Sequence, residues 1–305
     1  MRLIYLCSQP ATLYYAWQVE VMLTNFLEVG INPTDIHIVS SHYGVVPEAW
    51  NKLVAKFKGV KFAFYRDTRS NPSYISSVRP HILEKHWLAN PSLAQSRVLY
   101  HDCDILIPRK PDFDSLLEDS NVYVSDTVSY IGAKYISSKG EDYLDLMTDI
   151  VGVNKQTVID EEQNSGGAQY LLKYVDAKFW NKVYYDSETL YRVITRKIAK
   201  DKPNHPLQIW TADMWAVLWN LWWLNMRVKV TPLLSFCWGT SPVEQYDKHQ
   251  IYHNAGVTSG ESMFYKAAYI NKLPYYLDLS KIDQRFANYR YAEHIVKVGK
   301  TSCLK

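Results

Sequence analysis

The sequence has few cysteines, and their spacing matches neither a zinc site nor a redox pair. Cys7, Cys103, Cys237 and Cys303 are widely scattered. The sequence also lacks a long hydrophobic run, because its most apolar stretch, residues 214–224, is too short to cross a bilayer. The first seven residues are typical of a core strand. They lack the longer apolar stretch and the small-residue cleavage site of a signal peptide. These absences predict reduced thiols and a cytoplasmic protein with no membrane anchor in this chain.

The sequence also lacks a large excess of basic or acidic residues. The 34 basic and 31 acidic residues leave a net charge of +3, which does not favour a dedicated nucleic-acid binder. The densest basic stretch, residues 192–202, is most simply a solvated helix face. Apolar and aromatic residues are abundant, at 47% and 14%. With a length of 305 residues and no internal repeat, this composition predicts a single globular domain.

Strand-like and helix-like segments alternate through the first third of the chain. We expect strands at residues 3–7, 35–40 and 60–65, and helices at residues 15–29, 47–57 and 80–88. Such alternation predicts an α/β fold with a mixed, mainly parallel sheet flanked by helices. The later pattern is less regular. There we expect strands at residues 122–125 and 133–137, and helices at residues 141–151, 170–184, 187–199 and 214–224.

Two aspartates follow a buried strand in this pattern. Residues 98–100 form an apolar run, and Asp102-Cys103-Asp104 comes directly after it. Carboxylates in such a place must face a ligand, a metal or water. Because residues i and i+2 of an extended chain share a face, both side chains can bind one divalent cation and leave other coordination positions open for phosphate oxygens. The triplet is weak by itself, but ligands of such sheets bind at the carboxyl ends of strands.

Three further motifs accompany the aspartates in a definite order. Arg79-Pro80 begins a helix that ends in Trp87-Leu88, just before them. Gln163-Asn164-Ser165-Gly166-Gly167-Ala168 lies after them, and Ile251-Tyr252-His253-Asn254-Ala255-Gly256 lies near the C-terminus. This order resembles metal-dependent retaining glycosyltransferases of the GT-A fold, in which a DxD motif, an Asn-small-Gly turn, an acid on a later helix and a terminal His-x-x-Gly follow one another. The Arg-Pro…Trp-Leu helix most resembles plant hydroxyproline arabinosyltransferases and peptidyl-serine galactosyltransferases.

The resemblance covers about residues 1–270 and implies a GT-A-like (Rossmann-like) single domain with an irregular C-terminal portion. In that domain residues 1–125 bind the nucleotide-sugar, residues 126–270 bind the acceptor, and residues 271–305 form a C-terminal tail. The chain departs from the pattern in two ways. The plant enzymes are membrane-anchored, and the lysine that follows the terminal histidine closely in related families has no nearby equivalent before Lys266.

A metal site is the first implication of the resemblance. Asp102, Asp104 and His253 would hold a divalent cation, either Mn²⁺ or Mg²⁺. Two carboxylate oxygens and one imidazole suit Mn²⁺ better than Ca²⁺, and such a cation neutralises the charge of a departing diphosphate. On local grounds alone His253 is more simply a hydrogen-bonded histidine in a loop. The approach of His253 to the two aspartates is therefore the sharpest expectation.

The expected donor is a nucleotide-sugar, most simply a UDP-sugar. Glycines permit a close backbone approach or a positive φ, as a sugar-binding turn requires; the alternative is an ordinary turn. Arg79 and Lys266 can contact the phosphates of the donor; the alternative is that they are ordinary surface residues. The residues expected to contact the donor are Asp102, Asn164, Gly166, Gly167, Arg79 and Lys266.

Asp213 and Glu162 are the candidate catalytic acids. Asp213 lies between Trp210 and Trp215 in the most apolar part of the chain, where a carboxylate must be paired or must face a cavity. We expect it to contact hydroxyls of the sugar or acceptor; a structural salt bridge is the alternative. Glu162 follows Glu161, and an acidic loop is usually just solvated. Asp213 could serve an inverting or a retaining transferase. The resemblance favours retention of the configuration of the sugar.

The sequence thus predicts an enzyme, a hexosyl- or pentosyltransferase that moves a sugar from a nucleotide-sugar to a hydroxyl acceptor. The first expected acceptor is a hydroxymethylated base in DNA, because unanchored sugar transferases of this size are familiar from DNA-modifying phages. Arg109, Lys110 and residues 192–202 would supply the basic groove. A hydroxylated protein side chain or a glycan is the other acceptor class. Two other functions stay open: a non-catalytic nucleotide- or sugar-binding protein, and a metal-dependent phosphodiesterase.

Overall fold

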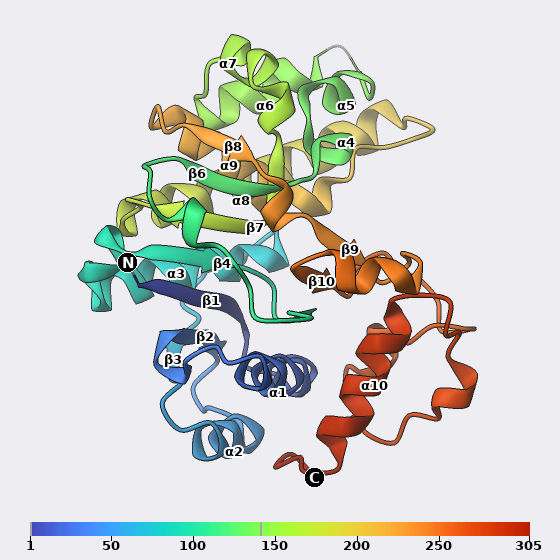
Figure 1. The fold of residues 1–305 in the computed structure, drawn as a ribbon. Helices are drawn as coiled ribbons and strands as arrows, with labels where there is room; N and C mark the ends of the chain where they lie inside the picture. The colour runs from blue at the N-terminus through green and yellow to red at the C-terminus, as the bar shows by residue number, and fades with distance from the viewer. Residues whose placement is uncertain (1, 141) are drawn as a thin grey trace. The chain divides into compact units, whose positions relative to one another are not determined.

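The structure is a computed structural model that describes residues 2–140 and 142–305 (Figure 1). Within these residues the strands form a seven-stranded sheet, in the order β3-β2-β1-β4-β7-β6-β8, and a three-stranded sheet, in the order β5-β10-β9. The strands are β1 (Leu3–Pro10), β2 (Ile36–His42), β3 (Lys61–Arg66), β4 (Arg97–Tyr100), β5 (Ile105–Leu106), β6 (Val122–Asp126), β7 (Gly166–Lys173), β8 (Val228–Val230), β9 (Phe236–Trp238) and β10 (Ile251–His253).

The strand directions confirm the predicted α/β fold. β1 runs parallel to β2, and β6 runs parallel to β8. β7 is antiparallel to both β4 and β6, so β4, β6 and β8 point the same way and β7 opposes them. The sheet is therefore mixed and mainly parallel. The helices are α1 (Leu13–Glu28), α2 (Glu48–Lys56), α3 (Val78–Ala89), α4 (Val128–Ile131), α5 (Ala133–Ser137), α6 (Tyr143–Val151), α7 (Lys155–Asp160), α8 (Ala177–Asp201), α9 (Ala212–Trp223) and α10 (Asn288–Gly299).

The chain divides into two compact units. Unit 1 is formed mainly by Tyr65–Tyr100 and Leu116–Pro232, and unit 2 by Ile4–Phe64, His101–Ser115 and Leu233–Lys305. The expected single domain, with boundaries at residues 125 and 270, stays a prediction. Among the described residues no helix is long and apolar enough to cross a membrane.

The core of unit 1 is rich in tryptophan. The rings of Trp87 on α3 and Trp180 on α8 lie 5.3 Å apart, and the Trp87 indole donates a hydrogen bond of 2.9 Å to the Val175 carbonyl. Trp215 and Trp219 on α9 are fully buried. The all-round apolar pattern of α9 therefore marks a core helix, as predicted.

In unit 2 a buried carboxylate joins α1 to the C-terminal segment. Glu20 accepts hydrogen bonds from Lys56 Nζ at 2.8 Å, Ser302 Oγ at 2.7 Å and the Cys303 amide at 3.0 Å. The Tyr275 hydroxyl also donates to it. The irregular C-terminal portion thus ends in a regular helix, α10, and in a segment held by Glu20.

Two of the elements expected from the sequence are wrong. Residues 133–137, expected as a strand, form α5, whose first amide donates to the Glu162 carboxylate at 2.6 Å. Residues 170–184, expected as a helix, begin inside β7, and α8 starts only at Ala177. The reason is that Tyr170, Leu171 and Leu172 are all buried between β4 and β6, and a continuous apolar run does not distinguish a buried strand from a buried helix.

Candidate metal centre

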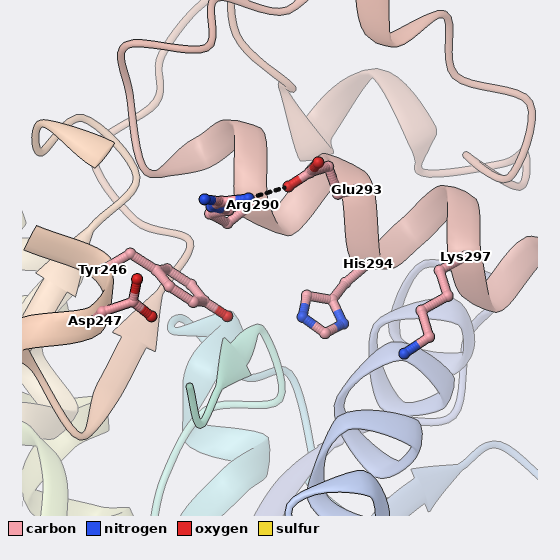
Figure 2. Close-up of a pocket in the computed structure, with 6 residues that line it drawn as sticks. All are labelled: Tyr246, Asp247, Arg290, Glu293, His294 and Lys297. Atoms are coloured by element: carbon pink, nitrogen blue, oxygen red, sulfur yellow. Dashed lines mark hydrogen bonds and ion pairs between the residues drawn. The ribbon is translucent and has the colours of Figure 1, made fainter. Parts of the chain in front are cut away.

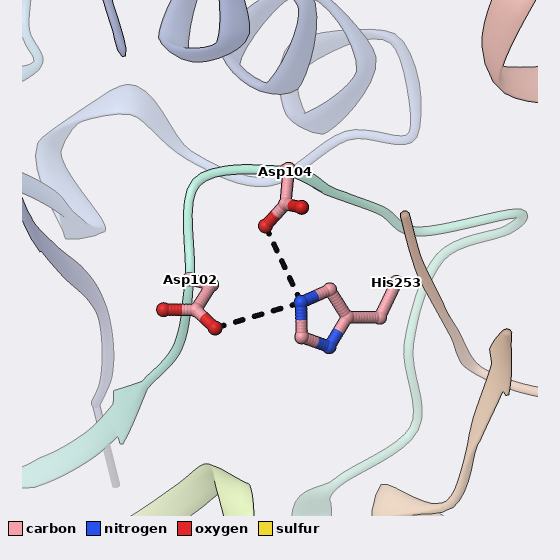
Figure 3. A group of neighbouring side chains, drawn as sticks. All are labelled: Asp102, Asp104 and His253. Carbon is pink, nitrogen blue, oxygen red and sulfur yellow. Dashed lines mark ion pairs between the residues drawn. The ribbon is translucent and has the colours of Figure 1, made fainter. Parts of the chain in front are cut away.

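Two short strands of unit 2 place the predicted metal ligands. Asp102 and Asp104 lie in the turn between β4 and β5. β10 pairs antiparallel with β5, and this register sets His253 opposite Ile105. The next amide, of Asn254, donates a hydrogen bond of 2.9 Å to the Asp104 carbonyl. A histidine far along the chain is thereby held beside the two aspartates, as Figure 3 shows.

The distances within the group fit a single cation. His253 Nε2 lies 3.3 Å from Asp104 Oδ1 and 3.5 Å from Asp102 Oδ2. One ligand atom of each of the three residues lies within 4.8 Å of the others. Neighbouring ligands at right angles around a small divalent cation are separated by about 3 Å, since each bond is about 2.1 Å long. The spacing and the oxygen and nitrogen donors therefore suit Mn²⁺ or Mg²⁺, and the expected convergence of these residues is observed.

Lys266 also belongs to this group. Its ammonium forms an ion pair with Asp104 Oδ2, so the Asp104 carboxylate presents one oxygen to Lys266 and the other to His253. Burial alone would raise the pKa of Asp104, but Lys266 and His253 outweigh it and hold that pKa well below its usual range. Burial likewise lowers the pKa of Lys266, but the facing Asp104 outweighs it and raises the pKa. Both groups are therefore charged at neutral pH.

Burial and local contacts fix the ligand side chains. The Asp104 side chain is 5% exposed, whereas that of Asp102 is 34% exposed, so the group opens to solvent on the Asp102 side. The His253 ring lies against Phe236 with a centroid distance of 5.3 Å. After β10, the Asn254 side chain accepts hydrogen bonds of 2.9 Å from Tyr252 and from Asn288. These contacts orient His253 without using its Nε2 atom.

In unit 1 the structure brings Arg79 and Asp213 together. Arg79 on α3 forms an ion pair with Asp213 Oδ2 in the first turn of α9. The Tyr74 hydroxyl donates a hydrogen bond of 2.6 Å to Asp213 Oδ1. The alternative that Asp213 makes a salt bridge is thus observed, and its catalytic role stays a prediction. No sequence signal had singled out Tyr74, because its hydroxyl reaches Asp213 only through tertiary packing.

The two glycines serve close packing within unit 1. A Cβ atom on Gly166 would lie 2.2 Å from Val124 Cγ2, and one on Gly167 would lie 2.7 Å from Met214 Cε. The positive φ of this segment falls on Ala168, at 68°. Gly166 is therefore needed for the close approach of β6, whereas the atoms nearest to Gly167 are the ends of side chains. Their expected contact with the donor stays a prediction.

Glu162 and Asn164 also have structural partners. Glu162 is buried and accepts the amide hydrogen of Ala133 at the start of α5, so the alternative of a solvated acidic loop is wrong for this residue. Asn164 donates to Glu161 at 2.7 Å and accepts from the Val230 amide at 3.2 Å. The catalytic role of Glu162 and the donor contact of Asn164 stay predictions.

Comparison with solved structures bears on the fold. No family model matches the chain, and no curated protein matches it. The apo structure of WbbM, a bifunctional glycosyltransferase, superposes with a TM-score of 0.52 at 13% sequence identity, covering 98% of this chain and 51% of that chain. The chain has a glycosyltransferase fold. It spans about half the length of the WbbM structure, and the predicted GT-A-like architecture is confirmed.

Weaker likenesses involve two other glycosyltransferases. Mouse xyloside xylosyltransferase 1 matches with a TM-score of 0.44 and 11% identity, over 85% of this chain and 100% of that chain. A glycosyltransferase involved in glycosylation of the major capsid of PBCV-1 matches with a TM-score of 0.35 and 11% identity, over 85% of this chain and 95% of that chain.

Proposed function

We propose that this protein transfers a sugar from a nucleotide-sugar to a hydroxyl acceptor in a metal-dependent reaction. The convergence of Asp102, Asp104 and His253 carries the proposal. These residues follow the carboxyl end of β4 in a chain with a glycosyltransferase fold. The carboxyl ends of strands are where α/β sheets bind their ligands, so a diphosphate can reach a cation held there.

The residues of the cluster have complementary tasks. Asp102, Asp104 and His253 bind the cation, for which Mn²⁺ matches the donor set. A bound cation supplies Lewis-acid neutralisation of the departing diphosphate. Lys266 adds a second positive charge at Asp104, and a lysine ammonium is a suitable point charge for a phosphate oxygen. We propose a UDP-sugar as the donor.

The sugar-contacting residues are proposed from unit 1. Asp213 is held in one orientation by Arg79 and Tyr74, which suits a carboxylate that positions a sugar or acceptor hydroxyl. Arg79, Asn164, Gly166 and Gly167 are proposed donor contacts, and Glu162 a further catalytic acid. We propose transfer with retention; NMR assignment of an inverted anomeric linkage in the product would overturn that choice.

Substitution of the aspartates tests the proposal. In Asp102→Asn and Asp104→Asn we expect Mn²⁺-dependent release of UDP from UDP-sugars to fall at least about a hundredfold, because metal sites lose that much even when only supporting groups are changed. Asp114→Asn, an exposed aspartate of the same segment, is the matched control. Wild-type turnover by both cluster variants, at equal folding stability, would refute metal-dependent transfer.

The acceptor is proposed first as a hydroxymethylated base in DNA. The contacts of two expected basic residues limit the charge or the hydrogen-bond donors that they offer. Lys197 pairs with Asp142 at 2.6 Å and with Asp201 at 2.7 Å, and Arg109 donates to the Asp247 carbonyl. A screen of hydroxymethylcytosine DNA, hydroxylated peptides and simple glycosides at low salt identifies the acceptor class. Transfer to a peptide or glycoside but not to DNA would refute the proposal that the acceptor is a base in DNA.

A further inference from the structure

Unit 2 contains a pocket that the proposed reaction does not use. Its volume is about 440 Å³, a size in the range of small-molecule sites. One wall is the 3-10 helix η8 (Val243–Lys248) and the other is α10. The lining residues, drawn in Figure 2, are Tyr246, Asp247, Arg290, Glu293, His294 and Lys297.

The helix spacing gathers the polar groups of α10 on the pocket. Arg290, His294 and Lys297 are four and three residues apart, so they follow one another along a single helix face. Figure 2 shows the Tyr246 hydroxyl pointing toward the His294 imidazole from the opposite wall. Groups from two separate elements therefore converge on one space.

Two buried atoms of this lining have no hydrogen-bond partner among the described residues. The Tyr246 hydroxyl and His294 Nδ1 make no hydrogen bond to any part of the chain that the structure describes. Tyr246 is only 6% exposed, so bulk water does not solvate its hydroxyl freely. A buried polar atom without a partner costs about 1–3 kcal/mol, and an ordered water or another bound molecule can supply the missing hydrogen bond.

The charges of the lining favour a neutral occupant. Arg290 is paired with Glu293 at 3.0 Å, and Lys297 is paired with Glu28 at 2.8 Å. An anion would have to compete with these carboxylates and would also face Asp247. Burial lowers the pKa of His294, so its imidazole is neutral at neutral pH.

Hydroxyl groups match this mixture of donors and acceptors. The Arg290 and Lys297 side chains only donate hydrogen bonds, and the Asp247 and Glu293 carboxylates only accept them, whereas a hydroxyl group does both. A hydroxyl can also bond to the Tyr246 side chain in either sense. We infer that this pocket binds a neutral polyhydroxylated molecule, a saccharide unit, at a site separate from the metal cluster. The inference does not depend on the proposed sugar transfer.

Ligand-observed NMR on the full chain tests this site. Saturation-transfer titrations use neutral methyl glycosides of glucose, galactose and xylose, with inorganic phosphate as a separate arm. We expect at least one glycoside to bind with millimolar affinity, and Tyr246→Phe, which removes one hydroxyl, to weaken that binding about tenfold. Tyr291→Phe is the matched control, since the Tyr291 hydroxyl on α10 is also buried and makes no hydrogen bond among the described residues, but Tyr291 does not line the pocket.

Several outcomes would overturn the inference. They are the absence of binding by every glycoside, binding of phosphate in place of the glycosides, and equal weakening by Tyr246→Phe and Tyr291→Phe in variants of equal thermal stability. Asp104→Asn separates the two sites. Glycoside binding that persists in Asp104→Asn supports the pocket even if sugar transfer is disproved, whereas its loss would place the glycoside at the metal cluster.

Discussion

At the scale of single residues, Asp104 is the most constrained group of the proposed centre. One of its oxygens faces His253 and the other is paired with Lys266. Because both neighbours stabilise the carboxylate, their effect on its pKa exceeds that of burial. Asp102 is more exposed and faces the same imidazole nitrogen. The two aspartates, which look equivalent in the sequence, therefore have different surroundings.

Removal of the Lys266 ammonium should have opposite effects on the binding of the metal and on the binding of the donor. In Lys266→Met the Asp104 carboxylate loses a competing cation, so we expect Mn²⁺ to bind several-fold more tightly in the absence of donor. The same change removes a positive charge near the diphosphate, so KM for the UDP-sugar should rise about tenfold. Calorimetric Mn²⁺ titration and steady-state kinetics check the two effects, with exposed Lys272→Met as control. Weaker Mn²⁺ binding in Lys266→Met would contradict this role.

Glu20 predicts a pH dependence of stability. Burial raises its pKa, but the hydrogen bonds from Lys56 and Ser302 outweigh it and lower the pKa below the ordinary 4.5. The ionised carboxylate therefore stabilises the fold above pH 4.5, and this contribution is lost as the pH falls through the lower folded pKa. Glu20→Gln should cost about 3 kcal/mol of unfolding free energy at pH 7, whereas exposed Glu48→Gln should cost almost nothing.

Urea unfolding over a pH series measures this contribution. The difference between wild type and Glu20→Gln should shrink as the pH is lowered below 4.5, where the wild-type carboxylate becomes protonated. A difference that stays constant down to the acid transition would show that the charge of Glu20 does not contribute.

At the scale of elements, the sequence predicts a strand or helix correctly where the local pattern of apolar residues distinguishes the two. The strand before Asp102 and the core helix α9 both agree with expectation. Residues 170–173 of β7 are expected as the start of a helix because both faces of the strand are buried, which removes the alternation of a strand. Residues 133–137 form α5 although a strand is expected there, because the first turn of α5 depends on Glu162, a residue of a different element. Such contacts are tertiary, and no local pattern contains them.

Gly166 gives a prediction about the β6–β7 pair. In Gly166→Ala the new Cβ would meet Val124 Cγ2 at 2.2 Å and the Ser125 carbonyl at 2.4 Å, so the strands must separate at a cost of about 3 kcal/mol. Thermal unfolding measures this cost. Gly260→Ala is the control, because the nearest atom to its new Cβ is Tyr265 Cβ at 3.4 Å. Equal stability of the two variants would contradict tight packing at Gly166.

At the scale of the whole molecule, the α/β class follows from the alternation of segments, and the two aspartates follow from their place after a strand. His253 was different. The residues around His253 favour an ordinary histidine in a loop, and only the order of the motifs along the chain indicates a metal ligand. The contact depends on β10 pairing with β5, two strands of three and two residues. The apolar run at residues 105–107 does not show which strand pairs with it, so only the structure establishes the contact of β10 with β5.

Pulsed electron paramagnetic resonance of the Mn²⁺-loaded protein tests whether these three residues form a metal centre. Electron spin-echo modulation detects the nitrogen of a coordinated imidazole. We predict that this coupling is present in the wild type, absent in His253→Gln and retained in His249→Gln. Absence of the coupling from the wild type, or its persistence in His253→Gln, would contradict a centre built from Asp102, Asp104 and His253.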